Sequence, residues 1–243
     1  MDIYNIKPPL TYFSCKKGDA VLDVKENLIR LTVKGEAWMG LDLNTNWQAS
    51  EFAFELFEAN GICVTTGLGL GVMQTLLCLN PNVTKVFAYE KSREVIDIFY
   101  MLVEKNNFDM SKLEIINLDA DTIKNITCNC LFLDHFEKES EEEIIQRVRI
   151  ISENNNCNLF WYWPAARQYS VFCAKQKLRI SNDSYKLWKS FTEIKKLPND
   201  LTDIQIKNIL NLSNVYVNLA KNAFIHDVTN QRNKLLNLFG SKK

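Results

Sequence analysis

Apolar residues in the middle of the chain follow two alternating patterns. Short runs that are nearly continuous in apolar residues are typical of buried parallel strands, and segments in which apolar residues return every third or fourth position are typical of helices. The predicted strands are an apolar run at 62–64 and residues 85–90, 113–119, 128–134 and 157–163. The predicted helices are residues 72–80, 92–107 and 141–155. This alternation predicts an α/β fold with a doubly wound, Rossmann-like sheet.

The flanks of this core have different patterns. Residues 20–24, 28–34 and 37–43 alternate apolar and polar positions, which predicts a small N-terminal antiparallel sheet, and a short helix is expected at 50–59. After Pro164 the strand pattern gives way to helical periodicity, and Thr202 with Gln205 forms a capping-box pattern. We therefore expect three parts: an N-terminal β region with a lid helix (1–60), the Rossmann-like core (61–164) and a basic C-terminal helical extension (165–243).

Composition and charge add one feature to this outline. With 47% hydrophobic and 24% charged residues, the chain has the balance of a globular protein, which excludes disordered, collagen-like and coiled-coil classes. The formal net charge is zero, but residues 1–163 carry 15 basic and 24 acidic side chains, whereas residues 164–243 carry 14 and 5. Such asymmetry is typical of a nucleic-acid or partner surface, or of two halves that attract one another. Both interpretations stay open.

The cysteines and the N-terminus exclude several classes. Seven cysteines are scattered along the chain without a paired metal-ligand spacing, so we expect reduced core thiols and no metal site. No basic segment followed by an apolar stretch opens the sequence, and no apolar run is long enough to span a membrane. We expect a cytoplasmic protein without a membrane partner.

Candidate chemistry gathers where the predicted strands end. Gly67, Gly69 and Gly71 fall within five residues between the first core strand and a helix, and closely spaced glycines there let backbone N–H groups approach a ligand. Glu90, Asp119 and Asp134 end the next three predicted strands. Because parallel strands end at one edge of the sheet, these groups are expected to lie together, and the carboxylate after the second strand can accept ribose hydroxyls.

The motifs VTTGLGLG, AYEKS, NLDAD and CLFLD, in this order over residues 61–164, resemble those of class I methyltransferases that use S-adenosylmethionine (SAM). Val72 stands where a dinucleotide-binding fingerprint expects its third glycine. The resemblance implies SAM as cofactor and assigns the glycine loop to its methionine and ribose parts, the acid after the second strand to the ribose, and the acid after the third to the adenine amine. The cofactor residues it implies are Gly67, Leu68, Gly69, Gly71, Glu90, Asp119 and Ala120.

The region before the glycine loop is similar to the spermidine-synthase branch of this superfamily. Thr65 stands where many methyltransferases have an acid, and WQASEFAFE (47–55) places Gln48 and Glu51 as that branch places its substrate-binding residues. The chain also resembles compact methyltransferase-like proteins of phage and bacterial genomes. Two departures from the branch are Ser50 in place of an Asp and the sequence DHFE (134–137) after the fourth strand.

The catalytic candidates follow the fourth strand. Asp134 and Glu137 are expected to act on the acceptor, and His135 can accept a proton near neutral pH. Trp163, after the fifth strand, is expected to wall a substrate pocket. Because DHFE lacks the D/N-P-P-Y/F motif of DNA amino methylation and no Pro-Cys dipeptide is present, a small-molecule acceptor is favoured.

The sequence thus favours a SAM-dependent methyltransferase-like enzyme. Aminopropyl transfer of the spermidine-synthase kind and a SAM-binding or structural module without turnover remain as alternatives. RNA stays open as a partner through the basic extension, and so does a homo-oligomer.

Overall fold

A computed structural model describes residues 8–43, 58–136 and 139–213 of the chain. The chain divides into two compact units, one made of Met1–Ala165 and Lys189–Asn199, the other of Ala166–Trp188 and Asp200–Lys243. The predicted helix at 50–59 lies mostly outside the described residues, as does the end of the basic extension.

The first unit contains a five-stranded parallel sheet. Its strands are β5 (Gly61–Thr66), β6 (Val83–Tyr89), β7 (Leu113–Ile116), β8 (Thr127–Leu133) and β9 (Asn156–Tyr162). The strand order is β7-β6-β5-β8-β9: the chain adds β6 and β7 on one side of β5 and then β8 and β9 on its other side, all parallel. The sheet is therefore doubly wound, which confirms the predicted fold class. A ligand crevice is therefore expected beyond the carboxyl ends of β5 and β8.

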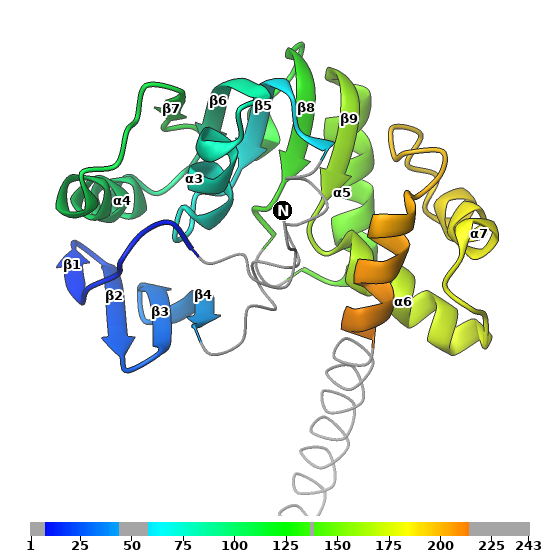
Figure 1. The fold of residues 1–243 in the computed structure, drawn as a ribbon, viewed down its shortest axis with the longest axis horizontal. Helices are drawn as coiled ribbons and strands as arrows, with labels where there is room; N and C mark the ends of the chain where they lie inside the picture. Colours follow the sequence, from blue (N-terminus) through cyan, green and yellow to red (C-terminus); the bar gives the residue numbers. More distant parts are fainter. Residues whose placement is uncertain (1–7, 44–57, 137–138, 214–243) are drawn as a thin grey trace, which may run out of the picture. The chain divides into compact units, whose positions relative to one another are not determined.

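Three helices connect these strands: α3 (Val72–Leu79), α4 (Arg93–Asn106) and α5 (Glu141–Glu153). Figure 1 shows α3 and α4 on the β6 side of the sheet and α5 beside β9, and α3 contacts β6 while α5 contacts β9. Ser92 caps α4 by accepting the Val95 N–H. Ser140 and Glu143 form a capping box at the start of α5, where three acidic residues complement the helix dipole.

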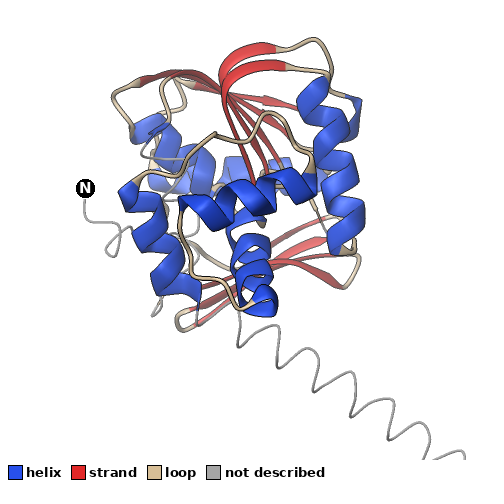
Figure 2. Ribbon diagram, turned by 90° about the vertical axis from the view of Figure 1, so that its right-hand side faces the viewer, coloured by secondary structure: helices blue, strands red, loops and turns tan. Residues whose placement is uncertain are grey.

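The predicted N-terminal sheet is present and has one strand more than expected. It comprises β1 (Cys15–Lys17), β2 (Ala20–Lys25), β3 (Leu28–Val33) and β4 (Glu36–Asp42), all antiparallel. Alternate residues face its core, with Ile29 and Leu31 fully buried. The sheet lies below the parallel sheet in both views, and α4 contacts β1 and β2 (Figure 1, Figure 2). Residues of β4 are thereby held near the carboxyl end of the parallel sheet.

The second unit is helical where it is described. It includes most of α6 (Ala165–Gln176) and of α7 (Asn182–Thr192), together with a helix at 203–213. The rings of Tyr169, Tyr185 and Trp188 form its core, with centroids 5.6–5.8 Å apart. The predicted capping box before residue 203 is present, because Thr202 Oγ1 accepts the Gln205 N–H and Gln205 Oε1 accepts the Thr202 N–H.

Gly71, at the start of α3, marks a close approach between α3 and α4. Its φ of +71° is in the left-handed region, and a Cβ there would overlap the buried ring of Phe99. We expect Gly71→Ala to lower the free energy of unfolding by about 2–4 kcal/mol, from backbone strain plus overpacking. Urea denaturation measures the loss.

Gly35→Ala provides the matched control, because Gly35 has a φ of +78° and no atom lies within 4 Å of the position that a Cβ would take there. That variant should lose only the backbone contribution, about 1 kcal/mol. Equal losses in the two variants would show that the Phe99 contact does not limit this position.

Candidate functional site

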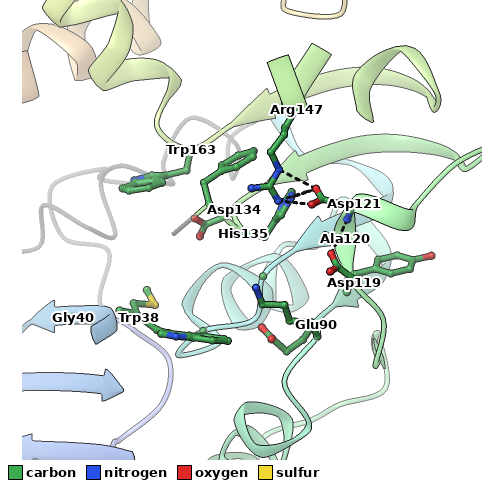
Figure 3. Close-up of a pocket in the computed structure, with 16 residues that line it drawn as sticks. Trp38, Gly40, Glu90, Asp119, Ala120, Asp121, Asp134, His135, Arg147 and Trp163 are labelled. Carbon is green, nitrogen blue, oxygen red and sulfur yellow. Dashed lines mark hydrogen bonds and ion pairs between the residues drawn. The ribbon is translucent and has the colours of Figure 1, made fainter. Parts of the chain in front are cut away.

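A cavity of about 320 Å³ opens at the carboxyl end of the parallel sheet, within the size range of small-molecule sites. All of its lining residues belong to the first unit, and they come from the end of β6, from the segments that follow β5, β6, β7, β8 and β9, from α5 and from β4 (Figure 3). The lining residues are Trp38, Met39, Gly40, Gly67, Gly69, Tyr89, Glu90, Lys91, Asp119, Ala120, Asp121, Asp134, His135, Phe136, Arg147 and Trp163.

The glycine loop follows β5, and only part of it reaches the cavity. Gly67 and Gly69 line the wall. Gly67 has a φ of +75°, and a Cβ there would overlap the backbone carbonyl of Asp134, so only glycine lets the two loops meet. Leu68 and Gly71, which the resemblance assigns to the cofactor, are not among the residues that line the cavity. Leu68 is 3% exposed, and a Cβ at Gly71 would meet Phe99.

Glu90 follows β6 and is almost fully buried beside the glycine loop. Its Oε2 accepts the Leu68 N–H at 2.9 Å and its Oε1 accepts the Ser92 N–H at 2.8 Å. Burial raises the pKa of Glu90, and these backbone donors oppose the rise. Asn117 fixes the backbone by donating to the Glu90 carbonyl at 2.8 Å. Glu90 therefore shapes the glycine loop as well as lining the cavity.

Asp119 lies three residues after β7 rather than at the end of the strand as predicted, because the strand ends at Ile116. It caps the 3₁₀ helix η2 (Ala120–Thr122), and its Oδ1 accepts the Asp121 N–H at 3.0 Å. Asp119 and Ala120 both line the cavity, next to one another in Figure 3. One carboxylate oxygen of Asp119 is engaged in the cap, which leaves the other for a ligand.

Asp134 directly follows β8 and lines the cavity. Its N–H donates to the carbonyl and to Oγ1 of Thr66, each at 3.0 Å. Burial raises the pKa of Asp134 to about 7, and the neighbouring Glu90 charge adds to the rise. Within the described part of the chain, no cation or hydrogen-bond donor pairs with its carboxylate. A carboxyl group of this kind can both accept and release a proton near neutral pH.

His135 lies in the wall of the cavity, but its side chain is mostly buried. Its side chain is 10% exposed, and both ring nitrogens are engaged: Nδ1 lies 2.6 Å from Thr66 Oγ1 and Nε2 lies 3.2 Å from Asp121 Oδ1. Burial lowers the pKa of His135, and the hydrogen bond to Asp121 opposes this effect. The ring has no free nitrogen directed at a substrate.

Asp121 and Arg147 form an ion pair at the same wall. Arg147 Nη2 contacts both carboxylate oxygens of Asp121, at 2.8 and 2.7 Å, and Nη1 pairs with Glu139. The guanidinium also lies over the Phe136 ring, 5.4 Å from its centroid. Burial raises the pKa of Asp121, but the hydrogen bonds from Arg147 and His135 outweigh this effect, so the pKa of Asp121 is lowered overall. Arg147 is thus neutralised by two carboxylates of the protein itself.

Three of the predicted site residues, Gln48, Glu51 and Glu137, lie outside the described residues. Trp163 lines the cavity as predicted, and Trp38 from β4 forms another aromatic wall, with the Lys91 ammonium 5.4 Å from its ring centroid. Sequence reasoning did not single out Asp121 or Arg147. The sequence shows an acid two residues after Asp119 and an arginine in the predicted helix at 141–155. Nothing in the sequence pattern indicates that these two residues pair with one another.

Three comparisons with known proteins give matches among the solved structures alone. No protein-family model matches the chain, and none of the curated proteins matches it. The chain is similar to the crystal structure of spermidine synthase from Thermotoga maritima, with 12% identity over 60% of this chain and 54% of that one and a TM-score of 0.43. It is similar to an S-adenosylmethionine-dependent methyltransferase from Clostridium acetobutylicum, with 11% identity over 48% and 47% and a TM-score of 0.34. It is also similar to Trm5b from Pyrococcus abyssi, with 13% identity over 57% and 38% and a TM-score of 0.38.

These matches span less than two thirds of each of the three known chains. The strand order and direction described above give the first unit a doubly wound, Rossmann-like fold, as the sequence predicts. In the part of the chain that the structure describes, no helix is both long and apolar enough to cross a membrane.

The raised pKa of Asp134 predicts a pH-dependent stability. Its folded value is about 7 against an unfolded value of 3.8, so between these two pH values the unfolded state binds fewer protons than the folded state. Stability from this group therefore falls as pH rises through that window and levels off above it. Because asparagine cannot ionise, Asp134→Asn should be more stable than the parent at pH 8, on the order of 4 kcal/mol.

Urea denaturation of both proteins at pH 5, 6, 7 and 8 measures this difference. The other titrating groups are common to the two proteins and largely cancel. A difference in unfolding free energy that does not change with pH would contradict the raised pKa.

Proposed function

We propose that this protein is a SAM-dependent transferase acting on a small-molecule acceptor. One observation carries the proposal: Gly67 and Gly69, Glu90, the Asp119–Ala120 turn and Asp134 converge on one cavity at the switch point of the sheet. These groups come from the ends of four strands that are distant in sequence. Their convergence supports the roles that the resemblance implies for them.

The charge of the cavity favours a cationic ligand. Its lining includes four carboxylates, Glu90, Asp119, Asp121 and Asp134, against two cations, Lys91 and Arg147. Arg147 is already paired with Asp121 and Glu139, so it is poorly placed to receive an anion. A ligand carrying a sulfonium and an ammonium suits this lining, whereas a dinucleotide pyrophosphate would meet net negative charge. The aromatic walls of Trp38 and Trp163 add surface for cation–π contact.

The individual groups fit the parts of SAM. The Glu90 oxygens accept the Leu68 and Ser92 N–H groups and keep lone-pair capacity for a ribose hydroxyl. The Asp119 oxygen outside the η2 cap can accept from an adenine amine, and the Ala120 backbone follows beside it. Gly67 and Gly69 keep this wall free of side chains, so a ligand can approach the backbone.

When bound, SAM supplies an electrophilic carbon next to a sulfonium. In-line transfer depends mainly on positioning and on exclusion of water, so the protein needs to orient the acceptor and receive one proton. Asp134 is the group for this task, because its pKa of about 7 makes its ionised form a base matched to neutral pH. His135 is poorly suited, since both of its ring nitrogens already have partners.

A binding panel tests the proposal. Calorimetry with SAM, S-adenosylhomocysteine, decarboxylated SAM, methylthioadenosine and NADH should give a dissociation constant for SAM tighter than about 1 mM, or roughly 4 kcal/mol, and weaker binding of NADH. If no adenosyl ligand reaches that affinity, the enzyme proposal is wrong. Preference for decarboxylated SAM would favour aminopropyl transfer, and binding without transfer to any amine, hydroxyl or RNA acceptor would favour a non-catalytic module.

Glu90 provides a residue-level prediction. Glu90→Ala should weaken SAM binding by about 1–3 kcal/mol, because charge-assisted hydrogen bonds to the ribose and support of the glycine loop are both lost. Glu114→Ala is the matched control, since Glu114 is a half-exposed carboxylate on β7 that pairs with Lys85 outside the cavity. Calorimetry on both variants, after circular dichroism has shown them folded, decides the point. Unchanged affinity in Glu90→Ala would refute the ribose assignment.

A further inference from the structure

A continuous chain of hydrogen bonds begins at the backbone of Asp134 and continues through other residues of the cavity wall. The Asp134 N–H donates to Thr66 Oγ1, this oxygen lies 2.6 Å from His135 Nδ1, and His135 Nε2 lies 3.2 Å from Asp121 Oδ1. Arg147 closes the chain at its outer end through Asp121. Figure 3 shows Asp121, Arg147 and His135 grouped beside Asp134. The chain joins β5, the loop after β8, η2 and α5.

The partners determine where the protons lie. Thr66 Oγ1 accepts the Asp134 N–H and has one proton of its own to donate, and His135 Nδ1 is the acceptor beside it. Asp121, as a carboxylate paired with Arg147, can only accept, so His135 Nε2 must carry the ring proton. The arrangement satisfies every group with a neutral imidazole in the Nε2–H tautomer.

The charges around His135 are consistent with a neutral ring. Asp121 and Asp119, in and before η2, attract a proton, whereas Arg147 on α5 repels it, and burial disfavours a charged ring. Asp134 is adjacent in sequence but reaches the chain through its backbone N–H. Thr66 itself is fully buried on β5. None of these contacts depends on a bound ligand.

We propose that Thr66 and His135 are positioning residues: they tie the backbone of Asp134 to the Asp121–Arg147 ion pair and thereby hold its carboxyl group towards the cavity. The catalytic part of this inference rests on the proposed function, in which Asp134 receives the acceptor proton. The structural part concerns the protein alone. It gives His135 a bridging role in place of the proton-accepting role that its position in the sequence suggests.

The chain offers a matched pair of variants. Thr66→Val removes the hydroxyl and keeps the shape of the side chain. Thr65→Val makes the same change one residue earlier on β5, where the hydroxyl is equally buried but accepts from Gln74 Nε2 at 3.1 Å instead of joining this chain. Thr66→Ser restores the hydroxyl alone. A general loss of packing would affect both valine variants alike, whereas loss of the hydrogen-bond chain affects Thr66→Val alone.

Nitrogen NMR of the histidine rings detects the hydrogen bonds of His135 directly. The protein has two histidines, His135 and His226, and His226→Gln assigns the signals. In the parent, His135 should be a single Nε2–H tautomer at pH 7. Thr66→Val should move its Nδ1 resonance towards that of a ring nitrogen without a hydrogen bond, while Thr65→Val leaves it unchanged and Thr66→Ser restores it.

Carboxyl carbon NMR of Asp134 measures how its titration responds to loss of the hydrogen-bond chain. In Thr66→Val the Asp134 N–H keeps the Thr66 carbonyl as its partner but loses its link to His135. The titration midpoint should therefore move from about 7 towards the ordinary aspartate value, because the carboxyl group is held less firmly and can turn towards solvent. An Nδ1–H tautomer in the parent, or Asp134 and His135 signals that are the same in Thr66→Val as in the parent, would overturn the inference and leave the SAM proposal standing. If SAM fails to bind while the NMR signals respond as expected, the proposed function fails and the catalytic role assigned to these residues fails with it.

Discussion

The close contact between Gly67 and the backbone of Asp134 is the constraint on which the site depends. Any side chain at Gly67 would overlap the Asp134 carbonyl, so the loops after β5 and β8 meet only because this position has no Cβ. That contact places the glycine loop directly beside Asp134, whose carboxyl group has the raised pKa, in the wall of one cavity. Glu90 fixes the loop from its other side through the Leu68 N–H. The same glycine loop is thus held by a steric contact on one side and a hydrogen bond on the other.

Much of the fold could be predicted from the sequence, because buried parallel strands are read from local apolar runs. The first core strand, the helix after it and the strand at 128–134 are all present within a few residues of their expected bounds. The third strand is shorter than predicted. It ends at Ile116 because the chain then turns into η2, where Asp119 acts as a helix cap. A cap and a strand end both place a polar residue after an apolar run, so the pattern alone does not distinguish them.

The candidate site was predictable where one residue follows one strand, and not where two distant elements meet. Asp134 and Glu90 line the cavity because each directly follows its strand. Leu68 and Gly71 share the glycine motif, yet the turn directs one into the core and the other onto Phe99. Asp121 and Arg147 are 26 residues apart, and their pairing depends on how α5 returns across the sheet end. Nothing local in the sequence specifies that return.

The Asp121–Arg147 pair also accounts for the different protonation of two neighbouring carboxyl groups. Both aspartates are drawn out of water, which raises the pKa of each. Arg147 reverses the effect at Asp121, whereas Asp134 has only the like charge of Glu90 as its charged neighbour among the causes of its shift. Because Glu139 takes the other side of the guanidinium, Arg147 does not compensate the charge of Asp134. Arg147, already paired with two carboxylates, thus keeps Asp121 ionised and leaves Asp134 able to exchange a proton near pH 7. The two aspartates differ in protonation because their environments differ and not because of residue type.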